Sequence, residues 1–162
     1  MALNAVVVSD STTLISLLNM KRFELLFLFS DTIVITPAVY SEVVVKHYAK
    51  EILDRYIEDG KVIVEEVDDT PKVKELLLRL DLGESESIVL ANEKQIPLII
   101  DEKRGKRVAK ALGIDVIGLI GILLVYKKRG YLSNDEIVEI VEALKEVNFR
   151  ISSKLLTLLL EA

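Results

Sequence analysis

The sequence lacks cysteine, has a single histidine and contains no long apolar run. Without cysteine the chain can form no disulfide, no zinc–thiolate site and no thiol nucleophile, a composition compatible with a reducing cytoplasm. One histidine, His47, argues against a zinc site or a Ser-His-Asp triad. The longest strongly apolar stretch, residues 116–126, is shorter than the roughly 20 residues of a membrane-spanning helix, so we expect a soluble cytoplasmic protein with no membrane contact.

The chain also lacks an excess of positive charge, because 21 lysines and arginines stand against 26 acidic residues, which gives a net charge of −5 and an isoelectric point of about 5.1. This balance argues against the broad phosphate grip of a strongly basic nucleic-acid-binding protein, although a local basic patch remains compatible with it. The 162 residues match one domain of ordinary size, and no linker or repeat divides them. We therefore predict a single domain over residues 1–162.

Short apolar runs alternate with helix signals along the chain. The predicted strands are residues 6–8, 33–35, 62–64, 97–100 and 116–117. After residue 10 we predict either two short helices or one bent helix. Further helices are predicted over residues 37 to about 47, 49–58, 102–112 and 153–160. Helices are also predicted to begin at residues 70, 82 and 133, and another to end before Gly130. Such alternation predicts a three-layer α/β/α fold with a parallel sheet of four to five strands. The C-terminal helices, 133–160, are expected to pack on it.

Acidic residues follow the predicted strands or begin the next helices. They are Asp10, Glu42, Glu86 and Asp101. In an open parallel sheet, ligands bind beyond the carboxyl ends of the strands, so these side chains are candidates for one site. Carboxylates gathered there repel one another unless a cation lies among them, and oxygen-only ligands favour Mg²⁺ or Mn²⁺.

Each acid also has a purely structural interpretation. Asp10 and Asp101 precede helices, where Asp is a favoured N-cap residue. Glu84 and Glu86 lie in a first helical turn, where the helix dipole stabilises negative charge. The hypothesis of a metal site therefore depends on the pattern of the four acids and not on any one of them.

Four segments carry a resemblance to a known family. They read VVVSDSTTLISLL, ITPAVYSEVV, LGESESIVLANE and LIIDEKRGKRVAKALGIDVIGLIGILL. Their order and spacing, over about residues 4–130, resemble the motifs of PIN domains, especially the VapC-like branch, and FRIS at 149–152 is similar to that branch's C-terminal end. The resemblance implies a metal-dependent nuclease whose catalytic, metal-binding acids are Asp10, Glu42, Glu86 and Asp101, with Ser11 or Thr12 orienting metal-bound water.

The third and fourth acids have competitors. Glu84 competes with Glu86, which is preferred because residues 87–91 follow it as the family pattern requires. Glu102 is a possible substitute for Asp101, since the residue that usually precedes the family's fourth acid is absent here.

A basic cluster, Lys103, Arg104, Lys106, Arg107 and Lys110, follows directly after Asp101. Lys103, Arg104 and Arg107 are candidates for contacting a nucleic-acid backbone beside the metal. The structural alternative is a solvated helix face with ion pairs.

These features predict a Mg²⁺- or Mn²⁺-dependent endoribonuclease that hydrolyses phosphodiester bonds of RNA. The resemblance further implies the toxin of a toxin–antitoxin pair, a small antitoxin partner and a homodimer. One alternative is a catalytically silent PIN-fold module that binds nucleic acid or protein. A small-molecule phosphatase is a third hypothesis, weakened because Thr12 stands where aspartyl-phosphate enzymes of the haloacid-dehalogenase type keep a second Asp.

Overall fold

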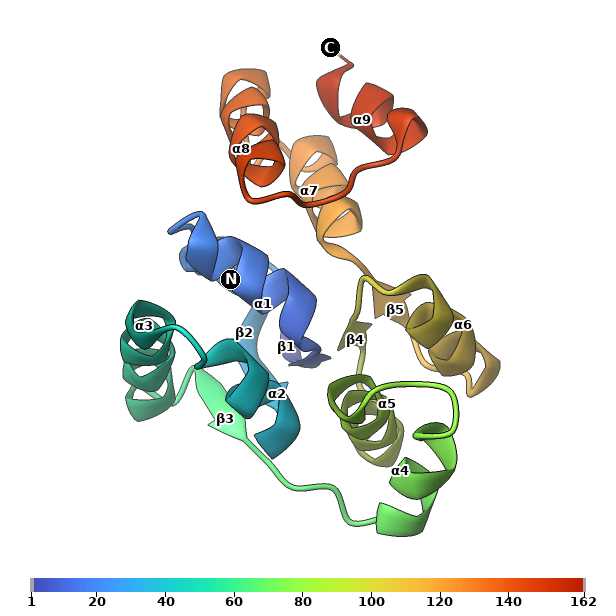
Figure 1. The fold of residues 1–162 in the computed structure, drawn as a ribbon. Helices are drawn as coiled ribbons and strands as arrows, with labels where there is room; N and C mark the ends of the chain where they lie inside the picture. The colour runs from blue at the N-terminus through green and yellow to red at the C-terminus, as the bar shows by residue number, and fades with distance from the viewer. Residues whose placement is uncertain (1, 162) are drawn as a thin grey trace.

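The computed structural model describes residues 2–161 and contains one sheet of five parallel strands. In chain order the strands are β1 (Asn4–Ser9), β2 (Ser30–Ile35), β3 (Val62–Val64), β4 (Leu98–Ile99) and β5 (Val116–Ile117). Their order across the sheet is β3-β2-β1-β4-β5, which places β1 at the centre (Figure 1). All four pairings are parallel, as the apolar runs predicted.

The helices connect these strands and extend beyond β5. They are α1 (Ser11–Asn19), the 3-10 helix η1 (Phe23–Leu28), α2 (Pro37–Val43), α3 (His47–Glu58), α4 (Thr70–Leu76), α5 (Leu82–Lys94), α6 (Lys103–Ala111), α7 (Leu119–Lys128), α8 (Asn134–Glu146) and α9 (Ser153–Leu160). None of the helices within residues 2–161 has both the length and the apolar character to cross a membrane.

One predicted boundary was wrong. The helix expected from Pro37 to about residue 47 ends at Val43, and α3 begins at His47. Val44 leaves the helical region, with ψ at 11°, and Lys46 is extended, with ψ at 132°. The β-branched run Val43–Val45 has low helix propensity, which is consistent with a break there.

Alternate residues of the strands lie on the two faces of the sheet. Val7, Ile33 and Ile99 belong to one hydrophobic core, and Val8, Val34 and Leu98 belong to the other. The first core is covered by η1, α1, α2, α3, α7, α8 and α9, and the second by α4, α5 and α6. Because both faces are buried, the strands are almost continuously apolar, and the three-layer α/β/α prediction is confirmed.

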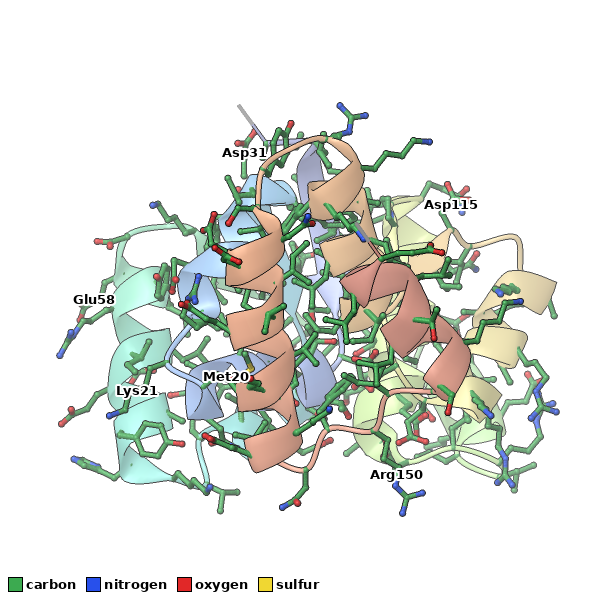
Figure 2. All side chains as sticks on the ribbon, turned by 90° about the horizontal axis from the view of Figure 1, so that it is seen from above. Met20, Lys21, Asp31, Glu58, Asp115 and Arg150 are labelled. Atoms are coloured by element: carbon green, nitrogen blue, oxygen red, sulfur yellow. The ribbon has the colours of Figure 1, made fainter. Side chains whose placement is uncertain are left out.

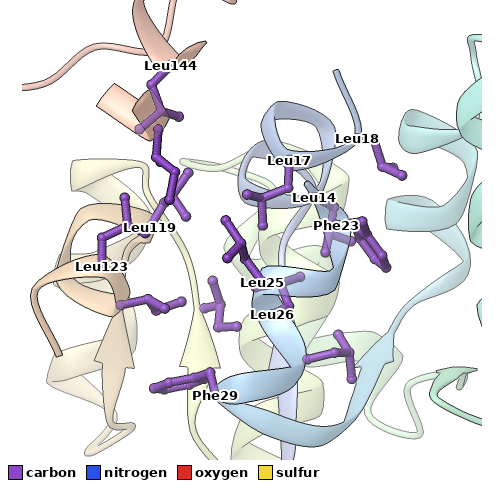
Figure 3. Packing of buried hydrophobic residues seen from close by; sticks show 14 of the residues in the cluster. Leu14, Leu17, Leu18, Phe23, Leu25, Leu26, Phe29, Leu119, Leu123 and Leu144 are labelled. Carbon is purple, nitrogen blue, oxygen red and sulfur yellow. The ribbon is translucent and has the colours of Figure 1, made fainter. Parts of the chain in front are cut away.

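The C-terminal helices pack on the first core through α7. Figure 3 shows Leu144 of α8 near Leu119 and Leu123 of α7, and all three side chains are almost completely buried. Burying a leucine of this kind contributes about 1.5–3 kcal/mol. At the end of α9, Lys127 of α7 donates from Nζ to the carbonyl oxygens of Leu158 and Leu159, each at 3.0 Å. These contacts hold the C-terminal end of α9 against α7.

Candidate active site

Asp10 lies at the carboxyl end of the central strand and is 3% exposed. It occupies the N-cap position of α1, but its side chain makes no capping hydrogen bond. Within residues 2–161 its Oδ1 atom is buried without a hydrogen-bond partner. Burial is the main cause that raises its pKa to about 7, and the charges of Asp81, Glu42 and Asp101 raise it further, against a lowering hydrogen bond from Ser11. A buried carboxylate with one unpartnered oxygen and no capping hydrogen bond is not explained as a helix cap.

Glu42 of α2 faces the same point as Asp10. Its Oε2 atom accepts a hydrogen bond from Ser11 Oγ at 2.7 Å. A Cβ atom placed on Gly83 of α5 would lie only 2.2 Å from Glu42 Oε1 and 3.5 Å from Asp10 Oδ1. The two carboxylates therefore meet at the start of α5, in space that only a glycine leaves open.

Glu84 is the acid of α5 that lies on the Asp10 side. It is 7% exposed, and its pKa is raised to about 7, mainly by burial and then by the charge of Asp81, with a smaller contribution from Asp10. Asp81 and Glu84 also form the capping box of α5, in which Asp81 accepts from the Glu84 amide at 2.8 Å. Glu84 therefore both caps the N-terminus of α5 and adds a carboxylate to the acids around Asp10.

Glu86 lies apart from these acids. Its Oε1 atom accepts from the amide of Ala38 at 3.2 Å, in the first turn of α2, and its side chain lines a different hollow, beside Pro37 and Leu82. Residues two apart on a helix point about 200° apart around its axis, so Glu84 and Glu86 cannot both face Asp10. The geometry thus favours Glu84 over Glu86 as the neighbour of Asp10.

Asp101 is half-buried after β4 and is held by two donors. Its Oδ2 atom accepts a short hydrogen bond from Thr13 Oγ1, and its Oδ1 atom accepts from the amide of Leu119 at 3.0 Å, at the start of α7. Glu102 is exposed and makes no capping hydrogen bond to α6. Of the two competing acids, Asp101 is the one whose charge raises the pKa of Asp10.

A hollow of about 990 Å³ opens beside these acids. Its acidic lining residues are Asp81, Glu84, Asp101 and Glu102, its basic ones are Arg79, Lys103, Arg104, Arg107 and Arg150, and Thr12, Val147, Asn148 and Phe149 are among the others. Within residues 2–161, none of the five basic side chains forms an ion pair. These five cations, the basic rim of the hollow, line it together with carboxylates, a combination that suits a metal ion next to a polyanion.

The acids are not gathered into a finished metal site. Within the described part of the chain, no three acidic or histidine side chains stand close enough together to hold one ion. Glu42 accepts a hydrogen bond from Ser11, and Asp101 accepts one from Thr13. Even so, the oxygen-only donors and the unpartnered Oδ1 of Asp10 fit Mg²⁺ or Mn²⁺.

Sequence reasoning did not find several of these residues. The spacing of Asp81 and Glu84 is a capping-box signal and could have identified Asp81. Nothing in the sequence distinguishes Thr13 from Thr12 as the residue that donates a hydrogen bond to Asp101. Arg79 lies only two residues before Asp81, but no motif distinguishes it. The segment 147–150 is far in sequence from the acids, and only the packing of α8 brings it to the same hollow.

Comparison with known proteins agrees with this architecture. A family model described as a PIN domain matches residues 6–162. A solved structure of a PilT N-terminus domain protein from the hyperthermophilic archaeon Sulfolobus solfataricus P2 is similar with a TM-score of 0.52 and 24% identity. The similarity covers 72% of this chain and 89% of that one, and it shows a shared fold. Among curated proteins, none matches the chain significantly.

Proposed function

This chain belongs to the PIN domain family, and we propose that it is a Mg²⁺- or Mn²⁺-dependent endoribonuclease. The observation that carries the proposal is Asp10, a buried carboxylate whose Oδ1 atom has no hydrogen-bond partner among the described residues, beside a hollow whose basic rim forms no ion pair there. A buried acid with a raised pKa in a cleft is typical of functional sites.

We assign metal binding to Asp10, Glu42, Glu84 and Asp101, replacing Glu86 by Glu84 because of its position. A bound divalent ion supplies a water of lowered pKa and neutralises charge on the leaving oxygen. Ser11 holds the carboxylate of Glu42 in place through its hydrogen bond. Thr12 lines the hollow and is available to orient a water molecule.

The basic side chains of α6 supply the phosphate contacts in this proposal. Lys103, Arg104 and Arg107 all line the hollow, and the guanidinium of Arg104 is positioned by its hydrogen bond to the carbonyl of Arg79 at 3.3 Å. Arginine and lysine that bind phosphates position the strand without reading its sequence.

The resemblance to VapC-like proteins supports two further parts of the proposal: the substrate is RNA, and the chain is a toxin controlled by a small antitoxin. The same resemblance suggests a homodimer. Growth arrest on expression of the wild-type chain, relieved by Asp10→Asn, would support the toxin role. Unaltered growth at matched protein levels would contradict it.

One observation favours a second candidate, a catalytically silent nucleic-acid-binding module. The acids of the described residues are not arranged to share an ion. In that case the basic rim would still bind RNA, but neither Mg²⁺ nor Mn²⁺ would produce cleavage.

The deciding experiment is cleavage of end-labelled single-stranded RNA with Mg²⁺, Mn²⁺ or EDTA. We expect metal-dependent cleavage by the wild type and its loss in identically purified Asp10→Asn. Equal cleavage by both proteins would mean a contaminant or a misplaced site. Binding without cleavage in either protein would establish the silent module, and a chromogenic phosphate ester tests the phosphatase hypothesis.

Glu84→Gln and Glu86→Gln form a matched pair on one helix. Both remove one charge from α5, so they differ mainly in which hollow the side chain faces. We expect Glu84→Gln to reduce cleavage by about 100-fold or more and Glu86→Gln to retain it within a few-fold. The reverse result would restore Glu86 as the third acid.

A further inference from the structure

The hollow beside the acids has a second wall, made by the C-terminal part of the chain. Val147, Asn148, Phe149 and Arg150 lie between α8 and α9 and line the hollow together with residues of α6. The proposed function uses α6 but gives no role to this segment. Its aromatic ring and its cation are the two kinds of group that bind an unpaired nucleotide.

The backbone of this wall is fixed by the end of α8. Asn148 has a left-handed φ of 61°, its amide donates to the carbonyl of Lys145 at 3.1 Å, and the amide of Phe149 donates to that of Leu144 at 2.9 Å. These are the two hydrogen bonds of a Schellman motif. On the other side, Ser152 caps α9 through the amide of Leu155 at 3.2 Å. The segment is thus held between two capped helix ends and presents its side chains in a defined place.

Arg150 is free to bind an anion. Its side chain is exposed and, within residues 2–161, forms neither an ion pair nor a hydrogen bond. Figure 2 shows it projecting outward from the loop between α8 and α9. Arg104 and Arg107 of α6 line the same hollow, so cations stand on both of its walls. A phosphate chain passing between the walls would meet positive charge on each side.

Phe149 is half-buried, so part of the ring packs on the first hydrophobic core while the residue also lines the hollow. An apolar residue at this position of a Schellman motif commonly packs against its own helix, which explains the buried part. The part that lines the hollow is next to a polar, charged surface. A nucleobase is the ligand that matches an aromatic surface beside phosphate-binding cations.

We propose that Val147–Arg150 forms the second wall of the nucleic-acid site, where Phe149 stacks on an unpaired base and Arg150 binds a neighbouring phosphate. The proposal rests on the proposed function and adds the residues that contact a base and a phosphate of the strand away from the metal-binding acids. Phe149 and Arg150 are specificity-determining residues in this arrangement and do not touch the reacting phosphate.

The test measures binding in EDTA, so that cleavage does not interfere. Two fluorescent single-stranded RNAs are compared, one complete and one with abasic sites throughout its central part. We expect Phe149→Leu, which keeps an apolar side chain, to weaken binding of the complete strand by about fivefold or more and to leave binding of the abasic strand unchanged. Phe149→Tyr, which keeps the ring, should bind both strands like the wild type.

Arg150→Gln tests the phosphate contact, with Arg129→Gln as the matched control because Arg129 is exposed at the end of α7 and does not line the hollow. We expect Arg150→Gln to lower the slope of log affinity against log salt by about 0.7 for both strands, as loss of one phosphate contact on a single strand does. The control should leave the slope unchanged.

The possible results separate this inference from the proposed function. Equal weakening of both strands by Phe149→Leu, together with a lower thermal midpoint, would show a purely structural ring and overturn the inference. Cleavage by the wild type with no effect of either substitution would overturn it while leaving the nuclease intact. Base-dependent binding without cleavage would support the inference and contradict the nuclease, and no binding of either strand would overturn both.

Discussion

Substituting Asp10 by Asn removes the most strongly buried acid of the site and should change how stability depends on pH. Burial and three nearby carboxylates raise the pKa of Asp10 in the folded protein from 3.8 to about 7. A carboxyl group shifted upward binds its proton more tightly in the folded state than in the unfolded state. Its contribution to stability is therefore complete below pH 4 and is lost as the pH rises through about 7.

The size of the effect follows from the same values. A pKa of about 7 in place of 3.8 corresponds to about 4 kcal/mol between pH 4 and pH 8. A domain of this size typically has a free energy of unfolding of about 5–15 kcal/mol, so the effect is a large fraction of it. Asp10→Asn carries no charge, and we expect it to be more stable than the wild type at pH 8 by up to about 4 kcal/mol and nearly equal to it at pH 4.

Urea unfolding at several pH values, in EDTA and in Mg²⁺, measures this prediction. With a denaturant slope of about 2 kcal/mol per molar, the midpoints of the two proteins should differ by about 2 M at pH 8. Mg²⁺ should raise the midpoint of the wild type at pH 8 and have little effect on Asp10→Asn. A wild type whose stability does not fall between pH 4 and pH 8 relative to the variant would refute the reasoning, because Asp10 would then have no raised pKa.

Three other substitutions test features in and outside the site. Gly83→Ala should raise helix stability by up to about 1 kcal/mol yet reduce cleavage by about 100-fold, because its Cβ displaces Glu42; unfolding and cleavage are measured on the same preparation. Thr13→Val should cost about 1.5–3 kcal/mol and lower cleavage by removing the donor to Asp101, and Thr13→Ser should restore both properties. Tyr126→Phe should cost about 1–3 kcal/mol of unfolding free energy with unchanged cleavage, since its buried hydroxyl donates to a backbone carbonyl far from the acids; a cleavage defect would contradict that.

The sequence by itself determined the fold class. Apolar β-branched runs such as Val6–Val8 are continuous because both faces of the sheet are covered, and that continuity identified buried parallel strands. The capping signals were equally local, and Ser133 begins α8 with the expected reciprocal hydrogen bonds to Glu136. Features with a local physical cause were thus predictable from short stretches of chain.

The positions of two acids followed from the same local logic. Asp10 and Asp101 come directly after central strands, and the parallel sheet brings the carboxyl ends of β1 and β4 to one edge. Their proximity was therefore implied by the strand pattern alone. Their roles in binding metal remain a prediction.

Only the tertiary structure shows how Glu84 and Glu86 lie relative to Asp10, and the identity of the third metal-binding acid stays a prediction. Both lie in the first turns of α5, and sequence does not state how that helix is rotated about its axis against the sheet. The packing of α5 turns Glu84 toward Asp10 and leaves Glu86 at the start of α2. A rotation of this kind depends on contacts between distant segments, which a local pattern does not contain.

The second wall of the hollow was decided in the same way. Phe149 is separated from Asp101 by one strand and three helices, yet α8 packs on α7 so that the end of α8 reaches the hollow. The Schellman motif that shapes this segment is local, whereas its place opposite α6 is a result of burying Leu144 against α7. Local hydrogen bonding set the form of each element, and the burial of apolar side chains between distant elements set which of their polar residues meet.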